Sequence, residues 1–501
     1  MIGLVLCRWS CEGRGKTMEF GAAPRTRPPL EALAAQTFSR ITEARRVDGN
    51  TIRLLRDGSE NYPLWLEAIA AARTTVHLEN YFIEEDEVGQ CFADALAGAA
   101  RRGLRVRVLY DWLGCKARTS RQFWNRLESA GVEVRSYNPP RLDNPLGWIS
   151  RDHRKLLCLD GQLAFAGGLC IGHDWKGDAG RGVAAWRDTA LEIRGPAVLP
   201  LESAFADSWA AAGPPLPPGQ VIAPRQESLS GAVPVWVIAG KPGSMGLYRL
   251  EQVVAEFAER SLWLSDAYFV ATTAYVRALC GAARNGVDVR LLVPGSSNFP
   301  AVQGLSRLGY RPLLAAGVRV FEWNGPMMHA KTAVADGCWS RIGSSNSNIS
   351  SWIANRELDL VVDDAGFAKE MEAMYELDLE NATEMIFQSG RIHAAGATHP
   401  SAMPPRVRRT ASAGRLIAGT VGFASAVGAS LSQKRPVGPT EGYILAAAGA
   451  ILLGLALVAA TLPRLIAYPI AALGAWIGLT LVIRAYKLRV AARVASSRER
   501  P

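Results

Sequence analysis

Two stretches of the chain repeat a spacing of residue types that can do chemistry on a bound anion. Each has the form HxKxxxxD, first as HRKLLCLD and then as HAKTAVAD, and together they supply His153, Lys155, Asp160, His329, Lys331 and Asp336. Apolar alternation predicts that each stretch is a strand, which places its histidine and lysine on one face. An imidazole can attack or exchange a proton near neutral pH, and an ammonium can neutralise an anion. We therefore predict that both stretches carry catalytic residues.

Small residues follow each motif, after a further predicted strand. The first motif is followed by GGLC, which includes Gly168, and the second by GSSN, which includes Ser344 and Asn346. Small residues let backbone and side-chain donors approach an anion closely, so these three are candidates for substrate binding. Further along, Asp188 and Glu357 occupy comparable places in WRDTALEIRG and NRELDLVV. A carboxylate on the second histidine nitrogen fixes the tautomer, so both acids are predicted to orient the histidines.

The segments around the motifs also occur twice. FADALAGAARRGLRVRVLYD matches YVRALCGAARNGVDVRLLVP, VHLENYFI matches LWLSDAYFV, and LESAGVEVRSYNP matches LLAAGVRVFEWNG. Within each pair, the same pattern of helix, glycine and alternating strand recurs in the same order. The chain therefore contains a duplicated α/β unit.

Composition divides the rest of the chain into segments. We predict a basic, loosely ordered leader at 1–45, the first half at 46–212, a Pro/Gly-rich linker at 213–232, the second half at 233–388, a basic linker at 389–412, a membrane region at 413–490 and a basic tail at 491–501. The linker between the halves contains AAAGPPLPPGQ, a composition typical of irregular connections.

The membrane region contains two uncharged stretches, at 442–462 and 465–483, separated only by Pro463 and Arg464. Both are long enough to cross the hydrocarbon core of a bilayer, so they predict a transmembrane helical hairpin. The alternative is a pair of buried helices in a soluble core. Basic residues flank the hairpin on both sides, which favours the cytoplasmic side of a bacterial inner membrane for both ends and for the catalytic halves.

Charge and cysteine usage restrict the partners. The chain of 501 residues has a net charge of +10 and a pI of about 9.3, so an anionic partner is expected. Nucleic acid and anionic lipid headgroups both fit that charge. The eight cysteines have no metal-type spacing and are predicted to be reduced and structural. The sequence also has no cluster of carboxylates or histidines typical of a metal site, so neither a metal nor another cofactor is expected.

Two HxKxxxxD motifs in one chain, the second followed by GSSN, resemble the phospholipase D superfamily over residues from about 50 to 385. The segments ENYFIEEDEVG, AARRGLRVRVLYDWLG and WRDTALEIRGPAV are most similar to those of bacterial cardiolipin synthases. The resemblance implies two similar phospholipase D-like α/β halves, each a β-sheet flanked by helices, with one active site at their interface. With the C-terminal transmembrane hairpin, this is the fold that we expect.

The resemblance also implies a reaction without a metal. One histidine attacks phosphorus to form a phosphohistidine, and the other protonates the leaving alcohol. By resemblance, His153 is the nucleophile and His329 the acid and then the base, with both lysines and Asn346 holding the phosphate oxygens. The motif aspartates would have supporting roles. Cys170 stands where the family has an asparagine, so the first half supplies one donor fewer. In the second half, Asn348 stands where many relatives have an aspartate.

Such enzymes join two phosphatidylglycerols, or a phosphatidylethanolamine and a phosphatidylglycerol, and release a small alcohol. Anionic glycerophospholipids such as phosphatidylglycerol and the lipid bilayer are therefore the expected partners. A hydrolytic phospholipase D that releases phosphatidic acid is the alternative on the same scaffold, and a nuclease of the superfamily also fits the basic pI. Two membrane helices and no base-stacking aromatic pattern disfavour the nuclease, so no nucleic acid is expected. A non-enzymatic membrane scaffold would predict a broken motif, and both motifs are intact.

Overall fold

The computed structural model describes residues 37–140, 150–178, 180, 182–220, 231–388 and 391–395, and single residues between 450 and 479. The first half contains β1 (Arg46–Arg56), α2 (Asp57–Ala71), β2 (Thr75–Asn80), α3 (Glu87–Arg101), β3 (Arg105–Asp111), α4 (Trp112–Cys115), α5 (Arg121–Ser129), β4 (Glu133–Tyr137), β5 (Lys155–Leu159), β6 (Leu163–Gly167), α6 (His173–Lys176), β7 (Thr189–Arg194) and α7 (Val198–Ala212). The second half contains β8 (Val233–Gly240), α8 (Gly246–Phe257), β9 (Ser261–Ser265), α9 (Thr273–Arg284), β10 (Asp288–Pro294), α10 (Pro300–Ala315), β11 (Arg319–Trp323), β12 (Thr332–Ala335), β13 (Trp339–Gly343), η3 (Ser350–Ala354), β14 (Glu357–Asp363), α11 (Ala365–Glu380), β15 (Ala382–Gln388) and β16 (Arg391–Ala394).

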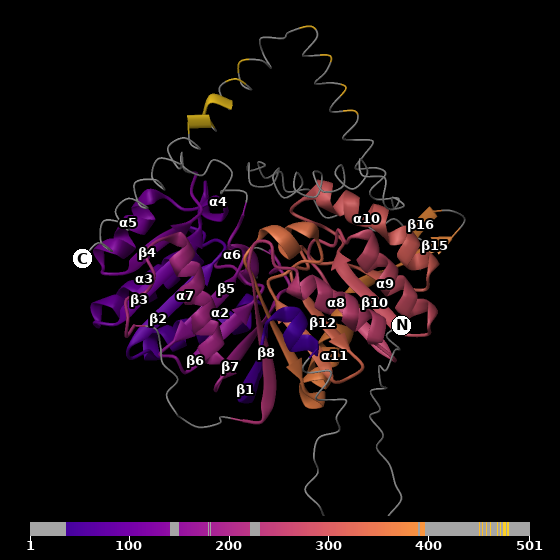
Figure 1. Ribbon diagram of the computed structural model, residues 1–501, viewed down its shortest axis with the longest axis horizontal. Coiled ribbons are helices and arrows are strands. Elements are labelled where there is room, and N and C mark those ends of the chain that lie inside the picture. Colours follow the sequence, from indigo (N-terminus) through magenta and orange to yellow (C-terminus); the bar gives the residue numbers. More distant parts are fainter. Residues whose placement is uncertain are drawn as a thin grey trace, which may run out of the picture.

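The strand order of the sheet repeats itself. The first half follows the order β4-β3-β2-β5-β6-β7-β1, and the second half follows the same order as β11-β10-β9-β12-β13-β14-β8. Strands β1 and β8 pair antiparallel and join the two halves into one sheet of 16 strands. Figure 1 shows the halves as two lobes that meet at β1 and β8. The duplicated α/β fold predicted from the sequence is confirmed, whereas the limits of the leader, linkers and tail stay predictions.

Equivalent helices begin and end on equivalent local signals. The side chain of Asp86 caps the start of α3, and Gly103 follows its end with a φ of 89°. The side chain of Thr272 caps the start of α9, and Gly286 follows its end with a φ of 92°. Capping side chains satisfy backbone N–H groups that have no partner within the helix, and glycine accepts positive φ without steric strain. The repeated sequence pattern therefore produces a repeated helix–strand connection.

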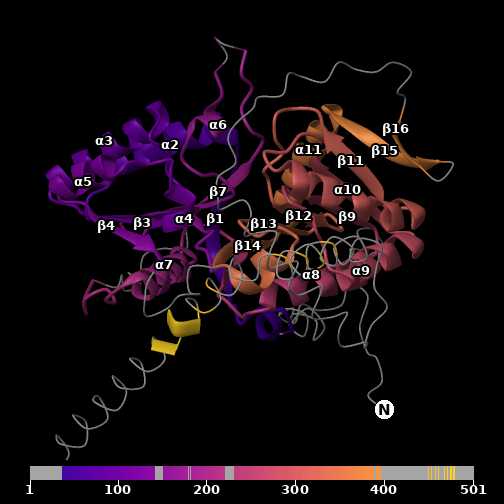
Figure 2. The same cartoon turned by 90° about the horizontal axis from the view of Figure 1, so that it is seen from above.

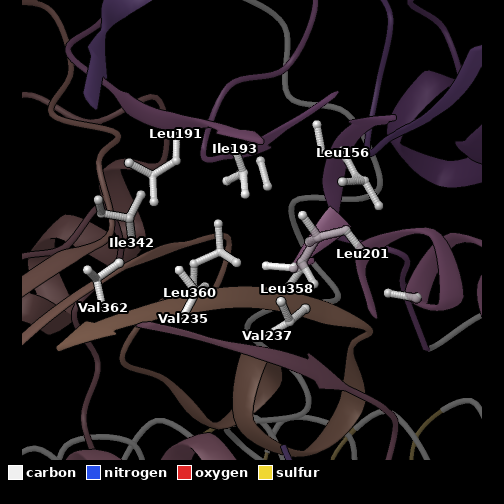
Figure 3. Packing of buried hydrophobic residues seen from close by; sticks show 14 of the residues in the cluster. Leu156, Leu191, Ile193, Leu201, Val235, Val237, Ile342, Leu358, Leu360 and Val362 are labelled. Atoms are coloured by element: carbon white, nitrogen blue, oxygen red, sulfur yellow. The ribbon is translucent and has the colours of Figure 1, made fainter. Parts of the chain in front are cut away.

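The two halves share a buried apolar core where their sheets pack face to face. In this core Leu191 of β7 lies beside Ile342 of β13, and Ile193 of β7 lies above Leu360 of β14 (Figure 3). Leu358 of β14 and Val237 of β8 belong to the same core. All of these side chains are less than a tenth exposed. Burial of one such side chain contributes about 1.5–3 kcal/mol, so this layer holds the halves in a fixed relative position. A site built from both halves can therefore keep its geometry.

The second half extends its sheet with a hairpin that the sequence patterns did not predict. Strands β15 and β16 pair antiparallel, and β15 continues the sheet beside β11. Figure 2 shows this hairpin projecting at the outer edge of the second half. The first half has no equivalent strands in the part that the structure describes.

The predicted spans at 442–462 and 465–483 lie mostly outside the described residues. Among the residues that are described, no helix has both the length and the apolar character needed to span a membrane. The predicted hairpin therefore stays a prediction.

Candidate active site

Both motifs lie at one edge of the sheet, where β2 and β9 end and β5 and β12 begin. Lys155 is the first residue of β5, and β12 begins directly after Lys331. The prediction that the histidines lie on these strands is wrong, because His153 and His329 precede them. Each histidine instead donates its backbone N–H across the interface, His153 to the carbonyl of Arg356 at 2.9 Å and His329 to that of Arg187 at 2.7 Å.

Each histidine is oriented by a carboxylate from the opposite half. Nδ1 of His153 lies 2.9 Å from Oε2 of Glu357, and Nδ1 of His329 lies 2.7 Å from Oδ2 of Asp188. Because an ionised carboxylate can only accept, Nδ1 donates in both pairs, and Nε2 is left for the reaction. The structure brings together the two histidines and the two acids, and it crosses their pairing between the halves.

Both lysines reach back to the histidine of their own motif. The Nζ of Lys155 donates to the carbonyl of His153, and the Nζ of Lys331 donates to the carbonyl of His329. Burial lowers the pKa of Lys331 to about 8, although the charge of Asp188 opposes the shift and that of Lys155 adds to it. The ammonium groups thus lie beside the two imidazoles, where they can neutralise an anion.

The pKa values of both histidines are lowered. Burial is the largest cause at His153, where Glu357 opposes it and Lys155 adds to it. Burial also lowers the pKa of His329 to about 3, with the charge of Lys331 adding to the effect and Asp188 opposing it. At neutral pH both imidazoles are therefore neutral unless a further negative charge lies nearby.

Aromatic side chains that the sequence analysis missed enclose the histidines. Tyr81 lies edge-on to His153, with ring centroids 5.1 Å apart. Around His329, the rings of Trp175, Trp186 and Tyr268 lie at centroid distances of 5.1, 5.6 and 6.0 Å. The two tyrosines were present in the repeated segments VHLENYFI and LWLSDAYFV, so their matching positions were the available signal.

Two of the predicted substrate-binding residues instead support the acids. The hydroxyl of Ser344 donates to Glu357 and accepts from the N–H of Leu358 at 2.9 Å, which leaves it no proton for a phosphate. Gly168 provides space, because a Cβ there would lie 2.1 Å from Oδ1 of Asp188. Both residues thus contact the acids, and their predicted role in substrate binding stays a prediction.

Asn346 is the predicted binding residue that keeps an unused polar atom. Its side chain is 4% exposed, and its Oδ1 is buried without a hydrogen-bond partner. Its place in the first half is taken by Cys170, whose thiol pKa is raised by burial. Because Oδ1 can only accept, a contact with a phosphate oxygen has to come from Nδ2 of the same amide.

The motif aspartates lie at the far ends of β5 and β12 from the histidines. Asp160 accepts from the N–H groups of Arg73, Thr74 and Thr75 at 2.8, 2.7 and 2.9 Å. Asp336 accepts in the same way from the residues that lead into β9. These contacts hold the starts of β2 and β9, so both aspartates support the fold and touch none of the reacting groups.

Metal ligands do not gather in this site. Within the described part of the chain, no three histidine, cysteine, aspartate or glutamate side chains lie close enough together to hold an ion. The two motif lysines bring positive charge next to the histidines.

Comparison with known proteins agrees with this geometry. A family model described as "Cardiolipin synthase, PLD-like domain" matches residues 65–173 and again 255–379, once in each half. Cardiolipin synthase A of Pseudomonas aeruginosa is 33% identical over 375 residues, which cover 72% of this chain and 75% of that protein. Cardiolipin synthase of Alkalihalophilus pseudofirmus is 33% identical over 340 residues, which cover 67% of each chain.

The fold is also found among solved structures. The crystal structure of phosphatidylserine synthase from Haemophilus influenzae superposes with a TM-score of 0.53 at 15% identity, over 66% of this chain and 87% of that one. Fold and matches together define a phospholipase D-type phosphatidyltransferase. Within that class, the chain belongs to the cardiolipin synthase family.

Proposed function

We propose that this chain makes cardiolipin by moving a phosphatidyl group from one phosphatidylglycerol to the free hydroxyl of another, with release of glycerol. The observation that carries the proposal is the crossed arrangement of the site, in which each histidine bonds an acid of the opposite half. The lysine of the same motif lies beside each histidine. Relatives named cardiolipin synthase cover about two thirds or more of the chain and support the same substrate class.

In the first step, Nε2 of His153 attacks phosphorus as the bond from phosphorus to the glycerol oxygen breaks. Glu357 holds Nδ1–H and stabilises the charge that grows on the ring. Lys155 and Lys331 neutralise the phosphate oxygens where negative charge increases, and Asn346 adds a side-chain donor. The product of this step is a phosphatidyl-histidine.

The leaving glycerol oxygen takes a proton from His329. Burial and Lys331 hold the pKa of His329 at about 3, and a phosphodiester between the lysines would raise that pKa, because a neighbouring negative charge favours the imidazolium. Substrate binding therefore favours uptake of a proton from solvent by His329, and the leaving group takes this proton.

In the second step, neutral His329 removes the proton from the hydroxyl of the acceptor lipid. The acceptor oxygen attacks phosphorus, the bond to Nε2 of His153 breaks, and both histidines return to their starting forms. A covalent intermediate divides one difficult displacement into two, and position decides whether a lipid alcohol or water completes it.

We further propose that the C-terminal region anchors the enzyme in the bilayer by the helical hairpin at 442–462 and 465–483, with the catalytic halves on the cytoplasmic side of the inner membrane. In this region four large apolar residues have helical backbone and are 61–74% exposed, namely Leu453, Leu457, Tyr468 and Leu479. Exposure of such apolar surface suits contact with lipid. A reporter fused after Pro501 should therefore behave as cytoplasmic, and periplasmic activity of the fusion would require an odd number of spans.

The test of the reaction is to incubate purified enzyme with phosphatidylglycerol in bilayers and to follow lipid products and released glycerol. Cardiolipin and glycerol in equal amounts are expected. Deletion of residues 411–501 should lower total activity on bilayers and shift the products toward phosphatidic acid, because the acceptor is then less concentrated at the site. Phosphatidic acid as nearly the whole product of the full-length enzyme would establish hydrolysis instead.

A further inference from the structure

The backbone that carries each orienting acid is attached to the opposite half by a short parallel bridge. Arg356 donates its N–H to the carbonyl of Arg151 at 2.8 Å and accepts from the N–H of His153 at 2.9 Å. Arg187 makes the equivalent bridge, donating to Met327 at 2.9 Å and accepting from His329 at 2.7 Å. The residue after each arginine is the acid that bonds the same histidine, so each histidine is held by backbone and carboxylate together.

The guanidinium group of each arginine is also held by the opposite half. Arg187 of the first half donates to Asp378 of α11 at 2.8 Å, and both side chains are 3% exposed. Arg356 of the second half donates to Asp207 of α7 at 2.7 and 3.0 Å, with side-chain exposures of 5% and 36%. Helices α7 and α11 follow equivalent strands, so the two ion pairs repeat one arrangement.

A second cation completes each arrangement. Asp378 also pairs with Arg56 at the end of β1, at 3.3 Å. Asp207 also pairs with Lys241, directly after β8, at 2.9 Å. Strands β1 and β8 pair with each other and join the two halves. Each aspartate therefore links the arginine that precedes an acid-bearing strand to one of these two joining strands.

We propose that Arg187–Asp378 and Arg356–Asp207 are positioning pairs, each acting on one histidine: Arg187–Asp378 on His329, and Arg356–Asp207 on His153. The physical reason is that each arginine is bonded to the orienting acid through the backbone and to the histidine through its carbonyl. Movement of the guanidinium therefore moves both groups that hold the imidazole. A displacement of about 1 Å at a reacting group can cost roughly a hundredfold in rate.

The inference rests on the proposed roles of the two histidines, and those roles make the two pairs distinguishable. If His329 supplies the proton to the leaving group, a donor whose leaving group needs no proton should bypass a defect at His329 in the first step. Phosphatidyl-p-nitrophenol is such a donor, because p-nitrophenolate leaves as an anion. A defect at His153 cannot be bypassed in this way, since the nucleophile is needed with either donor.

The experiment compares full-length Asp378→Asn and Asp207→Asn with phosphatidylglycerol and with phosphatidyl-p-nitrophenol, each labelled in the phosphatidyl group. With phosphatidylglycerol, both variants should be slower by roughly tenfold to a hundredfold. With phosphatidyl-p-nitrophenol, Asp378→Asn should release its first equivalent of p-nitrophenolate at nearly the wild-type rate and accumulate labelled enzyme. Asp207→Asn should stay slow and unlabelled, and Asp207→Glu should recover part of the rate.

Glu322→Gln is the matched control, because it breaks a partly buried ion pair with Arg307, 2.6 Å long, away from both histidines. It should behave as wild type with both donors. Equal losses with both donors in both variants, or a lower unfolding temperature with an unchanged donor preference, would overturn the inference. The opposite donor preference would support the two pairs and exchange the proposed roles of the histidines. Failure of wild type to form any labelled enzyme would instead overturn the proposed function.

Discussion

The two halves share one backbone plan but line the site differently around their histidines. His329 lies among two tryptophans and a tyrosine, and its side chain is 6% exposed. Among the described residues, His153 has one aromatic ring beside it, that of Tyr81, and its side chain is 12% exposed. Histidines in equivalent sequence motifs therefore have different surroundings. The more accessible ring suits attack on an incoming phosphodiester, and the enclosed ring suits proton transfer away from water.

The acids differ between the halves together with the residues beside them. Asp188 accepts a second hydrogen bond from the indole of Trp175 at 2.7 Å, and Gly168 leaves room for its carboxylate. Glu357 is one methylene longer, and its second donor is the hydroxyl of Ser344, at the position equivalent to Gly168. Each acid thus has a neighbour of matching size. The comparison teaches that a duplicated site keeps its hydrogen bonds while the side chains that supply them change.

The largest effect is expected when either histidine is removed. His153→Ala and His329→Ala should each lose roughly 10³-fold in turnover, because each loses a nucleophilic or proton-transfer role. Phosphatidyl-p-nitrophenol labelled in the phosphatidyl group should mark His329→Ala but not His153→Ala, because its leaving group needs no proton. Label in His153→Ala alone would assign the nucleophile to the other half.

Replacing the orienting acids tests whether their pairing is crossed. Glu357→Gln and Asp188→Asn should each lose about 10²- to 10⁴-fold in turnover, because an amide can donate to Nδ1 and select the wrong tautomer. Glu357→Gln should resemble His153→Ala in the labelling assay, and Asp188→Asn should resemble His329→Ala. The control is Glu202→Gln, which alters a buried histidine–acid pair with His77 elsewhere in the first half. Pairing within each half predicts the reverse assignment.

Exchanging the residues at one equivalent position tests the difference in phosphate binding. Asn346→Ala should lower kcat/KM by about 10²-fold, because a buried donor to the phosphate is removed. Cys170→Asn should change kcat/KM by only a few-fold, because the first half already works without this donor. A loss in Cys170→Asn as large as that in Asn346→Ala would show that the thiol has a function of its own. Unfolding temperatures of both variants check that the fold is retained.

The pH dependence should report on the lysine of the second half. Because burial lowers the pKa of Lys331 to about 8, its charge is present below that pH and lost above it. If this charge holds the phosphate, kcat/KM should fall by about tenfold for each pH unit above 8. In Lys331→Arg the fall should disappear up to pH 10, since a guanidinium keeps its proton. The same fall in Lys331→Arg would assign it to another group.

The smallest effect is expected from a chelator. The lysines supply the positive charge in both halves, so activity should persist in excess EDTA. The measurement is cardiolipin formation before and after prolonged dialysis against EDTA. Loss of activity that one divalent metal restores would contradict the mechanism proposed for both halves.

The sequence by itself determined the duplication and the reacting residue types. Three features each occur twice at matching offsets: the HxKxxxxD motif, the small residues after it and the helix–glycine–strand segments. They are local patterns, so they can be recognised without knowing how the chain packs. Asp188 and Glu357 could be selected as orienting acids for the same reason. The contacts of Ser344 and Gly168 with the acids could not be predicted in this way, because small residues serve close packing as well as anion binding.

Only the tertiary structure decided which groups meet. His153 and Glu357 are 204 positions apart, and His329 and Asp188 are 141 positions apart, so no local spacing could pair them. The same holds for the arginine–aspartate pairs and for the rings around His329. These contacts form because β6 and β7 of the first half pack against β13 and β14 of the second across an apolar layer that includes Leu191 and Leu358. Packing between the two similar halves therefore brings each acid to the histidine of the other half.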